Sequence, residues 1–188
     1  AVGAPGDAGA TGAGAPAREP LHPWVVDSDY LVTMGIPLLA GRAFTPGDSG
    51  EAPTVALMNE SGARRVFGSV EAALGRRVRV WGPWEWEVVG VVGDVRHVSP
   101  EVDPGVQVYF PITQMPGFSR VELVVRSALP PGRIAAAVGA ELQELDPAMP
   151  TREFRTMDAR LERATSARRF TLRVLGAYGA VALFLAGL

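Results

Sequence analysis

The chain has 188 residues, of which 47% are hydrophobic and 20% charged, so it can bury one good core or two small ones. Its formal net charge of -2 favours neither nucleic acid nor an anionic membrane surface as a partner. The absence of cysteine excludes disulfides, thiol catalysis and thiolate metal sites. The chain begins at Ala1 without a charged and apolar leader, and we interpret both ends as cuts within a longer protein.

The first segment consists almost entirely of Ala, Gly and Pro. Such a composition buries too little apolar surface to offset the entropy that ordering would cost. We therefore predict that residues 1–22 form a flexible linker or a long loop.

The next segment contains a short strand candidate and a short helix candidate. Apolar residues at 23–26 predict a strand, and residues 30–34 predict a helix that Asp27 or Ser28 caps. Gly35 can end this helix in a left-handed conformation. The run at 36–42 contains a proline, which restricts it to an edge strand or an extended connection.

Residues 54–94 carry the clearest sheet signals. The apolar run at 54–58 predicts a buried strand, and Asn59 then caps a helix that Gly68 closes. Residues 77–81 alternate between polar and apolar, which is typical of a half-buried strand. The segment at 84–92 alternates first and then becomes apolar on both faces, which predicts a central strand that ends at Gly93-Asp94.

The next part of the chain predicts a strand-helix-strand unit. Strand candidates lie at 106–110, 121–126 and 151–154. Between the last two lies a helix whose apolar positions recur at spacings of three and four. These positions are Ile134, Val138, Leu142 and Leu145.

The last segment predicts a long helix that enters a membrane. Thr156 is a candidate N-cap, and residues 174–188 contain no charged side chain. A spanning helix needs about 20 apolar residues, so the full span is an expectation about sequence beyond Leu188. Three arginines just before this run, Arg168, Arg169 and Arg173, could meet lipid headgroups. The alternative is an amphipathic helix packed on the domain.

The sequence predicts no catalytic centre and no cofactor or metal site. Asp94 and His97 are spaced for half of a metal site, but no second pair of ligands completes it, and a polar turn is the favoured interpretation. Ser61 and Ser99 lack the flanking glycines of a nucleophile elbow. No phosphate-binding loop of the Walker type is present, so this segment cannot hydrolyse nucleotide by that route.

Three tryptophans surround the predicted Gly82-Pro83 turn: Trp81, Trp84 and Trp86. If the strands alternate, these side chains cannot all face one core. We interpret them as an exposed tip that contacts a partner protein. The alternative is that a long loop covers them.

Several motifs in the same order resemble the MacB-like periplasmic core domain of ABC-transporter permeases, the family that includes FtsX-like proteins. The resemblance covers roughly residues 24–188 and is carried by Asp29–Phe44, Val55–Phe67, Leu74–Arg77, Val88–His97, Val108–Pro111, Leu145–Pro147 and Arg155–Met157.

The resemblance implies an α+β fold with two subdomains. Residues 23–105 resemble the mixed-sheet Sabre subdomain, and 106–156 resemble one half of the strand-helix-strand Porter subdomain. Residues 157–188 resemble the stalk helix that runs into the membrane. The other half of Porter would lie upstream of Ala1, which leaves a sheet edge without its partner.

The resemblance also implies a non-enzymatic role in the bacterial inner membrane, with this segment mainly on the periplasmic side. There it would couple cytoplasmic ATP hydrolysis to export or to force transmission. The implied partners are an ABC ATPase subunit, a second permease copy or duplicated half, a periplasmic adaptor or substrate protein, and the lipid bilayer. An alternative is a membrane-tethered sensor or binding module without transport activity, and further apolar helices downstream would favour the permease.

Overall fold

The computed structural model describes residues 2–3, 8–9, 20–80, 84–95, 103–115, 117, 121–147, 154–157 and 159. The chain divides into two compact units. The first, which we call the sheet unit, comprises residues 1–97 and 101–126, and the second, the helical unit, comprises 98–100 and 127–188.

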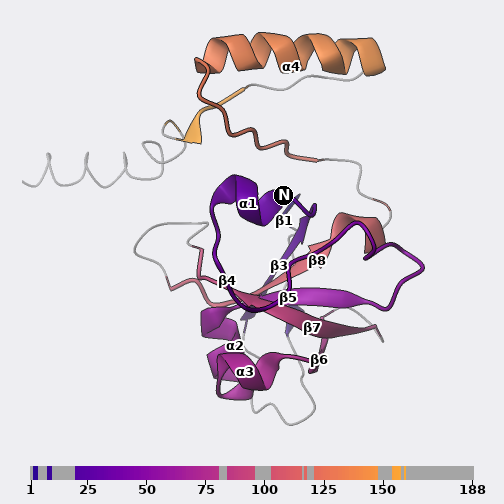
Figure 1. Ribbon diagram of the computed structural model, residues 1–188, viewed down its shortest axis with the longest axis vertical. Helices are drawn as coiled ribbons and strands as arrows, with labels where there is room; N and C mark the ends of the chain where they lie inside the picture. Colours follow the sequence, from indigo (N-terminus) through magenta and orange to yellow (C-terminus); the bar gives the residue numbers. More distant parts are fainter. Residues whose placement is uncertain are drawn as a thin grey trace, which may run out of the picture. The chain divides into compact units, whose positions relative to one another are not determined.

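The sheet unit is built on a mixed sheet in which the strand order is β1-β3-β8-β5-β7-β4 (Figure 1). Two further strands lie off this path, because β2 pairs with β3 and β6 pairs with β7. The strands are β1 (Val2–Gly3), β2 (Ala8–Gly9), β3 (Pro20–Val26), β4 (Leu38–Gly41), β5 (Val55–Asn59), β6 (Arg77–Arg79), β7 (Glu85–Val92) and β8 (Val106–Pro111).

Parallel and antiparallel pairs are combined in this sheet. β3 is parallel to β8, and β5 is parallel to β7. β8 and β5 are antiparallel, and they join the two parallel pairs into one sheet. Every residue of β5 and of β8 is buried, because helices or loops cover both faces at the centre of the sheet.

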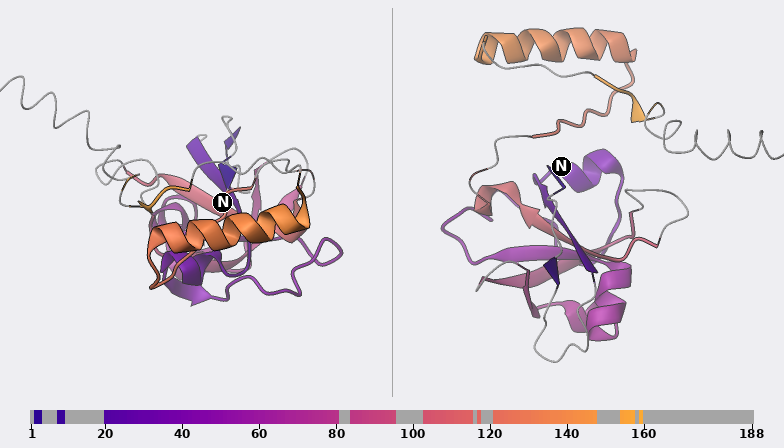
Figure 2. Two further views of the ribbon diagram at one scale, coloured as in Figure 1. Left: turned by 90° about the horizontal axis from the view of Figure 1, so that it is seen from above. Right: turned by 180° about the vertical axis from the view of Figure 1, so that it is seen from behind.

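Helices cover opposite faces of the sheet. α1 (Tyr30–Met34) lies on one side, and α2 (Glu60–Phe67) and α3 (Val70–Ala73) lie on the other, as the rear view of Figure 2 also shows. Each face has its own core because side chains alternate along the strands. Met58 and Val108 belong to the core beneath α2 and α3, whereas Leu57 and Tyr109 belong to the core beneath α1.

Local capping rules account for the helix ends. Asn59 caps α2 through a hydrogen bond from the Gly62 amide (3.1 Å), and Gly68 ends this helix in a left-handed conformation. Gly35 ends α1 in the same way, at φ 70°. The N-cap of α1 differs from the expectation, since Asp29 occupies it while Asp27 accepts a hydrogen bond from the Asp29 amide.

Two glycines allow β7 to change partners along its length. β6 pairs with β7 from Glu85 to Glu87, and β4 pairs with it from Gly90 to Val92. A Cβ at Gly41 would lie 2.2 Å from the Val89 carbonyl oxygen, and one at Gly90 would lie 2.3 Å from the Arg42 carbonyl oxygen. Glycine is therefore required on both strands where they meet.

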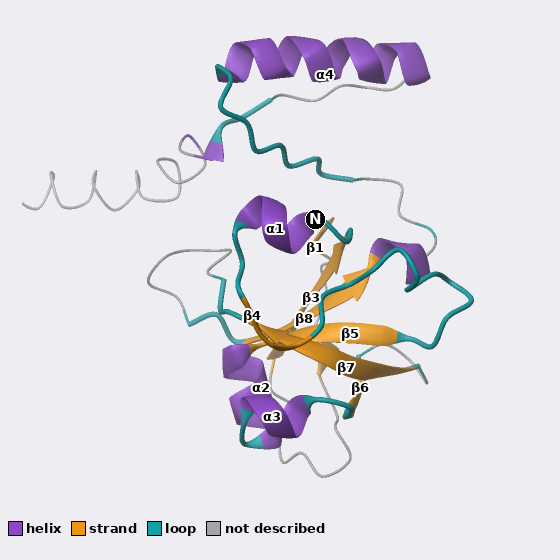
Figure 3. Cartoon of the chain, in the orientation of Figure 1, coloured by secondary structure: helices purple, strands orange, loops and turns teal. Residues whose placement is uncertain are grey.

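The segment predicted as a strand at 121–126 is not a strand in the structure, and Figure 3 shows it as a loop. Val121, Leu123 and Val125 are 62%, 65% and 49% exposed. A strand needs a hydrogen-bonded neighbour, and none is paired with this segment among the described residues. The expected strand at 151–154 is likewise missing at Phe154, while 151–153 lie outside the described residues.

The described part of the helical unit consists of α4 (Pro131–Leu145) and a few residues near 157. Thr156 Oγ1 accepts a hydrogen bond from the Ala159 amide (3.2 Å), the contact expected of an N-cap. Within the part of the chain that the structure describes, no helix combines the length and apolar character needed to cross a bilayer. The predicted membrane segment at 174–188 lies outside the described residues, as does most of the predicted stalk.

The unit boundaries differ from those expected from the sequence. β3 begins at Pro20, and the two-residue strands β1 and β2 also fall within the segment interpreted as a linker. β8 was expected to start the second subdomain, yet it lies at the centre of the sheet between β3 and β5. The division into compact units therefore falls after residue 126 and not after 105.

Candidate functional site

A buried asparagine joins three segments at one end of the sheet. Asn59, the last residue of β5, is fully buried. Its Nδ2 donates to Asp94 Oδ1 (2.7 Å) and to the Gly105 carbonyl (3.0 Å). Its Oδ1 accepts from the backbone amides of Gly62 (3.1 Å) and Gln107 (2.8 Å). Both donor hydrogens and both oxygen lone pairs of this side chain therefore have protein partners.

The Asp94 carboxylate lies just beyond the end of β7 and faces the start of α2. Asp94 Oδ1 accepts from the Ser61 amide (3.0 Å), and Oδ2 accepts from the Ser61 hydroxyl (2.6 Å). A carboxylate in this position also interacts favourably with the helix dipole. The polar turn expected at Asp94 is thus a tie between β7 and the helix that follows β5. His97, the other half of the unfavoured metal-site alternative, lies outside the described residues.

Gln107 and Tyr109 extend this cluster along β8. Gln107 Nε2 donates to the carbonyls of Val95 (2.6 Å) and Pro104 (3.2 Å), and its Oε1 accepts from the Tyr109 hydroxyl (3.0 Å). Burial raises the pKa of the Tyr109 hydroxyl far above its usual value, and the nearby Tyr30 and Asp94 add to this shift. Tyr109 is therefore a neutral hydrogen-bond donor and not a proton-transfer group at neutral pH.

A second polar cluster shapes the loop between β4 and β5. Arg42 donates two hydrogen bonds to the Asp48 carboxylate (2.8 and 2.9 Å), and the Thr45 amide donates a third (2.8 Å). The hydrogen bond from Arg42 holds the pKa of Asp48 below its usual value, and the bonds from Thr45 lower it further. This carboxylate is buried because its charge is matched within its own loop.

The same loop is tied to the residues that follow β8. These residues form a short 3-10 helix, η1 (Ile112–Gln114). Gln114 Oε1 accepts from the Val55 amide (3.0 Å), and its Nε2 donates to the carbonyls of Ser49 (3.0 Å) and Pro53 (2.9 Å). The Thr113 hydroxyl donates to the Asp48 carbonyl (2.5 Å).

The predicted tryptophan patch is only partly formed. Trp84 is 64% exposed, as expected, but Trp86 is 4% exposed, so its expected place on the surface is wrong. Trp86 lies on the inward face of β7 and packs edge-on against Phe110, with ring centroids 4.7 Å apart. Trp84 precedes the strand and has no such cover. Trp81 lies outside the described residues.

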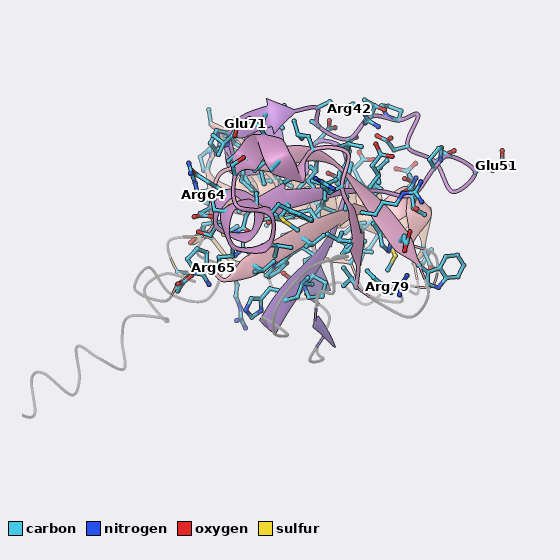
Figure 4. All side chains as sticks on the ribbon, turned by 90° about the horizontal axis from the view of Figure 1, so that it is seen from below. Arg42, Glu51, Arg64, Arg65, Glu71 and Arg79 are labelled. Carbon is cyan, nitrogen blue, oxygen red and sulfur yellow. The ribbon has the colours of Figure 1, made fainter. Side chains whose placement is uncertain are left out.

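Charged side chains flank this hairpin and the first helix of the opposite layer. Glu85 pairs with Arg79 (2.7 Å) and more loosely with Arg77 (3.5 Å) across β6 and β7. Arg64 pairs with Glu60 along α2 (2.9 Å). Figure 4 places Arg64 at the end of the sheet unit away from Arg79. These are exposed ion pairs, which contribute little to stability.

The two polar clusters hold segments together and do not present a reactive group. Within the described residues, no three His, Asp or Glu side chains gather in a way that could hold a metal ion. No Ser, His and carboxylate lie together in these clusters as nucleophile, base and orienting acid. The arrangement therefore defines a mixed α+β domain whose polar residues act as structural ties.

Sequence reasoning identified Asn59 as a cap and Asp94 as the end of a strand, but it missed the contact between them. The signal was present, because each residue follows an apolar run that forms a buried strand. The ends of adjacent parallel strands meet at one edge of a sheet. The register of β5 against β7, in which Asn59 lies opposite Val92, brings the two side chains together.

Comparison with known proteins assigns this domain to a family. Residues 8–145 match the model of the MacB-like periplasmic core domain. The chain therefore belongs to the family of MacB-like periplasmic core domains, as its motifs led us to expect. No match was found among the curated proteins.

Solved structures with a similar fold come from three sources. The periplasmic region of MacB from Actinobacillus actinomycetemcomitans has a TM-score of 0.57 and 19% identity, and the match covers 73% of this chain and 62% of that one. A domain of a putative permease protein from Porphyromonas gingivalis has a TM-score of 0.49 and 20% identity, with 82% and 76% covered. The extracellular domain of the noncanonic ABC-type transporter YknZ from Gram-positive bacteria has a TM-score of 0.43 and 21% identity, with 58% and 51% covered.

Proposed function

We propose that this chain is the extracytoplasmic domain of an ABC-transporter permease in the bacterial inner membrane. In this role it couples cytoplasmic ATP hydrolysis to the export of a periplasmic substrate or to force transmission. The observation that carries the proposal is the family match over residues 8–145, supported by the likeness of the fold to the periplasmic region of MacB. The chain spans 62% of that region.

The proposal assigns ATP hydrolysis to another polypeptide or domain, since the sequence has no Walker-type loop. The partners are then an ABC ATPase subunit and a second permease copy or duplicated half. A periplasmic adaptor or substrate protein completes the assembly, and the lipid bilayer holds it. Nucleic acid has no part in this role.

The unpaired segment at 121–126 supports a half-subdomain interpretation of the helical unit. Its apolar side chains are exposed, and its backbone has no strand neighbour among the described residues. In α4, Ile134, Val138 and Leu142 form a half-buried apolar stripe. We infer that the Porter-like half at 106–156 takes its missing strand from chain upstream of Ala1, with the Sabre-like part at 23–105. Extending the chain upstream should protect the amides of 121–126 from hydrogen exchange.

The force-transmission role needs a stiff connection between the membrane and the domain. Residues 156–188 contain no proline, which suits a continuous stalk helix. Replacing Ala164 and Ala167 by proline in the full-length permease should abolish transport while expression and ATP binding persist. The double serine substitution at the same positions is the matched control and should retain transport. Full transport by the proline variant would contradict the lever mechanism.

Trp84 is the candidate partner contact at the tip of the β6–β7 hairpin, together with Trp81. The buried Trp86 provides the control. Trp84→Ala should weaken binding of the adaptor or substrate protein to the full-length permease and leave the thermal midpoint within a few degrees. Trp86→Ala should lower the free energy of unfolding by about 3–5 kcal/mol. A large loss of stability on replacing Trp84 would contradict the contact role.

A further inference from the structure

The chain enters and leaves the central sheet through two neighbouring parallel strands. β3 and β8 pair in unbroken register from Leu21 opposite Val106 to Val26 opposite Pro111. The upstream chain reaches β3 at Pro20, and the chain toward the helical unit departs after Pro111. Because the two strands are parallel, these points lie at opposite ends of the same ladder. β1 and β2, which pair with the other edge of β3, contribute two residues each.

This geometry fixes how the ladder responds to tension. A pull between the start of β3 and the end of β8 acts along the strands, so all the ladder hydrogen bonds carry load together. A pull applied at the same end of both strands separates the pairs one after another. The first mode resists a larger force because no single pair can open first.

We propose that the β3–β8 pair is a shear clamp, which lets the sheet unit carry tension between the upstream chain and the helical unit without unfolding. This inference rests on the proposed function, in which the domain transmits force. It assigns the load to one strand pair and adds a specific residue that protects it.

β8 is held to the rest of the sheet unit near its start. The Gln107 amide donates to Asn59 Oδ1 (2.8 Å), and its side chain donates to the Val95 carbonyl (2.6 Å). All six residues of β8 are buried. Load that reaches β8 therefore spreads into β5 and into the residues that follow β7, and β8 does not slide out alone.

Gln114 holds the other end, where the chain departs. Its three hydrogen bonds, to Val55, Ser49 and Pro53, fasten η1 to the loop before β5. Tension from the helical unit meets these bonds before it reaches the β8 ladder. Gln114 is thus a positioning residue that prevents β8 from being peeled away at its exit.

The absence of cysteine allows the clamp to be tested with two pairs of attachment points on the full chain in nanodiscs. His22→Cys with Gly117→Cys pulls along the strands, and Asp29→Cys with Gly117→Cys pulls across them. All three positions are exposed. At equal loading rates in optical tweezers, we expect the first pair to need at least about twofold more force. Equal forces in the two directions would overturn the clamp.

The role of Gln114 is tested in the same apparatus. Gln114→Ala should lower the rupture force along the strands by about a third or more, because the bonds at the exit are lost. Gln143→Ala, which changes an exposed glutamine of α4, is the matched control and should leave that force unchanged. An unchanged force in folded Gln114→Ala would overturn the positioning role. If that variant does not fold, Thr113→Val removes one bond at the same exit and should lower the force by a smaller amount; an unchanged force there would likewise overturn the role.

These measurements need neither ATPase nor transport, so they separate the clamp from the proposed function. Direction-dependent rupture together with intact transport in the stalk proline variant would refute the lever mechanism and leave the clamp standing. Direction-independent rupture together with transport that fails in the proline variant would refute the clamp alone.

Discussion

The side-chain amide of Asn59 donates a 2.7 Å hydrogen bond to the carboxylate of Asp94, and this contact ties the end of β5 to the end of β7. The two residues are separated by 35 positions in the sequence. Asp94 also receives two hydrogen bonds from Ser61, so one carboxylate fixes both the strand ends and the start of α2. The following predictions test this tie and three other features of the sheet unit.

Replacing Asp94 by alanine should lower the free energy of unfolding by about 1–3 kcal/mol, because the Asn59 amide would lose a partner in a buried position. The measurement is the midpoint of urea denaturation at pH 7. Glu51→Ala is the control, since Glu51 is exposed on a loop, and its effect should stay within about 0.5 kcal/mol. Equal effects of the two substitutions would show that the Asn59–Asp94 tie contributes nothing.

Replacing Asn59 by aspartate should destabilise the fold more at pH 7.5 than at pH 4.5. The new carboxyl would be buried beside Asp94, and both burial and the neighbouring charge raise its pKa in the folded state. The folded protein then binds this proton more tightly than the unfolded chain does, so its stability relative to wild type falls as pH rises above about 4. Chemical denaturation at the two pH values measures the difference. The same loss at both would contradict the buried contact.

The Asp48 carboxylate should stabilise the loop between β4 and β5 only while it is charged. Its pKa in the folded state is lowered, first by the hydrogen bond from Arg42, so its contribution is present at neutral pH and is lost as pH falls through that lowered pKa. Asp48→Asn should therefore be less stable than wild type at pH 7, and the gap should shrink below about pH 4. Thermal midpoints across this range provide the test. A constant gap would mean that the charge of Asp48 is irrelevant.

Two glycine-to-alanine substitutions should have opposite effects. Gly90→Ala places a methyl group 2.3 Å from the Arg42 carbonyl oxygen, which should force β4 and β7 apart and cost about 2–4 kcal/mol. Gly139→Ala meets no atom within 4 Å in α4 and should stabilise that helix by about 0.5–1 kcal/mol. Circular dichroism during heating would follow both. A harmless Gly90→Ala would contradict the close approach of the two strands.

Features set by neighbouring residues could be predicted from the sequence. Asn59 as a helix cap and the left-handed glycines at 35 and 68 depend on the local backbone alone, and the structure confirms them. The apolar run at 54–58 and the alternation at 84–92 likewise predicted strands because burial on one or both faces leaves a periodic pattern.

Features that depend on distant neighbours could not be predicted in this way. The pattern at 121–126 is that of a strand, yet a strand forms only beside another, and periodicity does not report whether that neighbour is present. Trp86 was placed on the surface because the sequence does not show that Phe110 covers it. The pairing of Asn59 with Asp94 follows from strand order, which the local pattern leaves open.

The extended segment at 121–126 has a practical consequence for handling the protein. Val121, Leu123 and Val125 project from a backbone whose amide and carbonyl groups are open to pairing, which is the signature of a self-association site. Any purified form that exposes this segment should precipitate in a concentration-dependent manner. A charged substitution such as Leu123→Glu would keep such a preparation in solution.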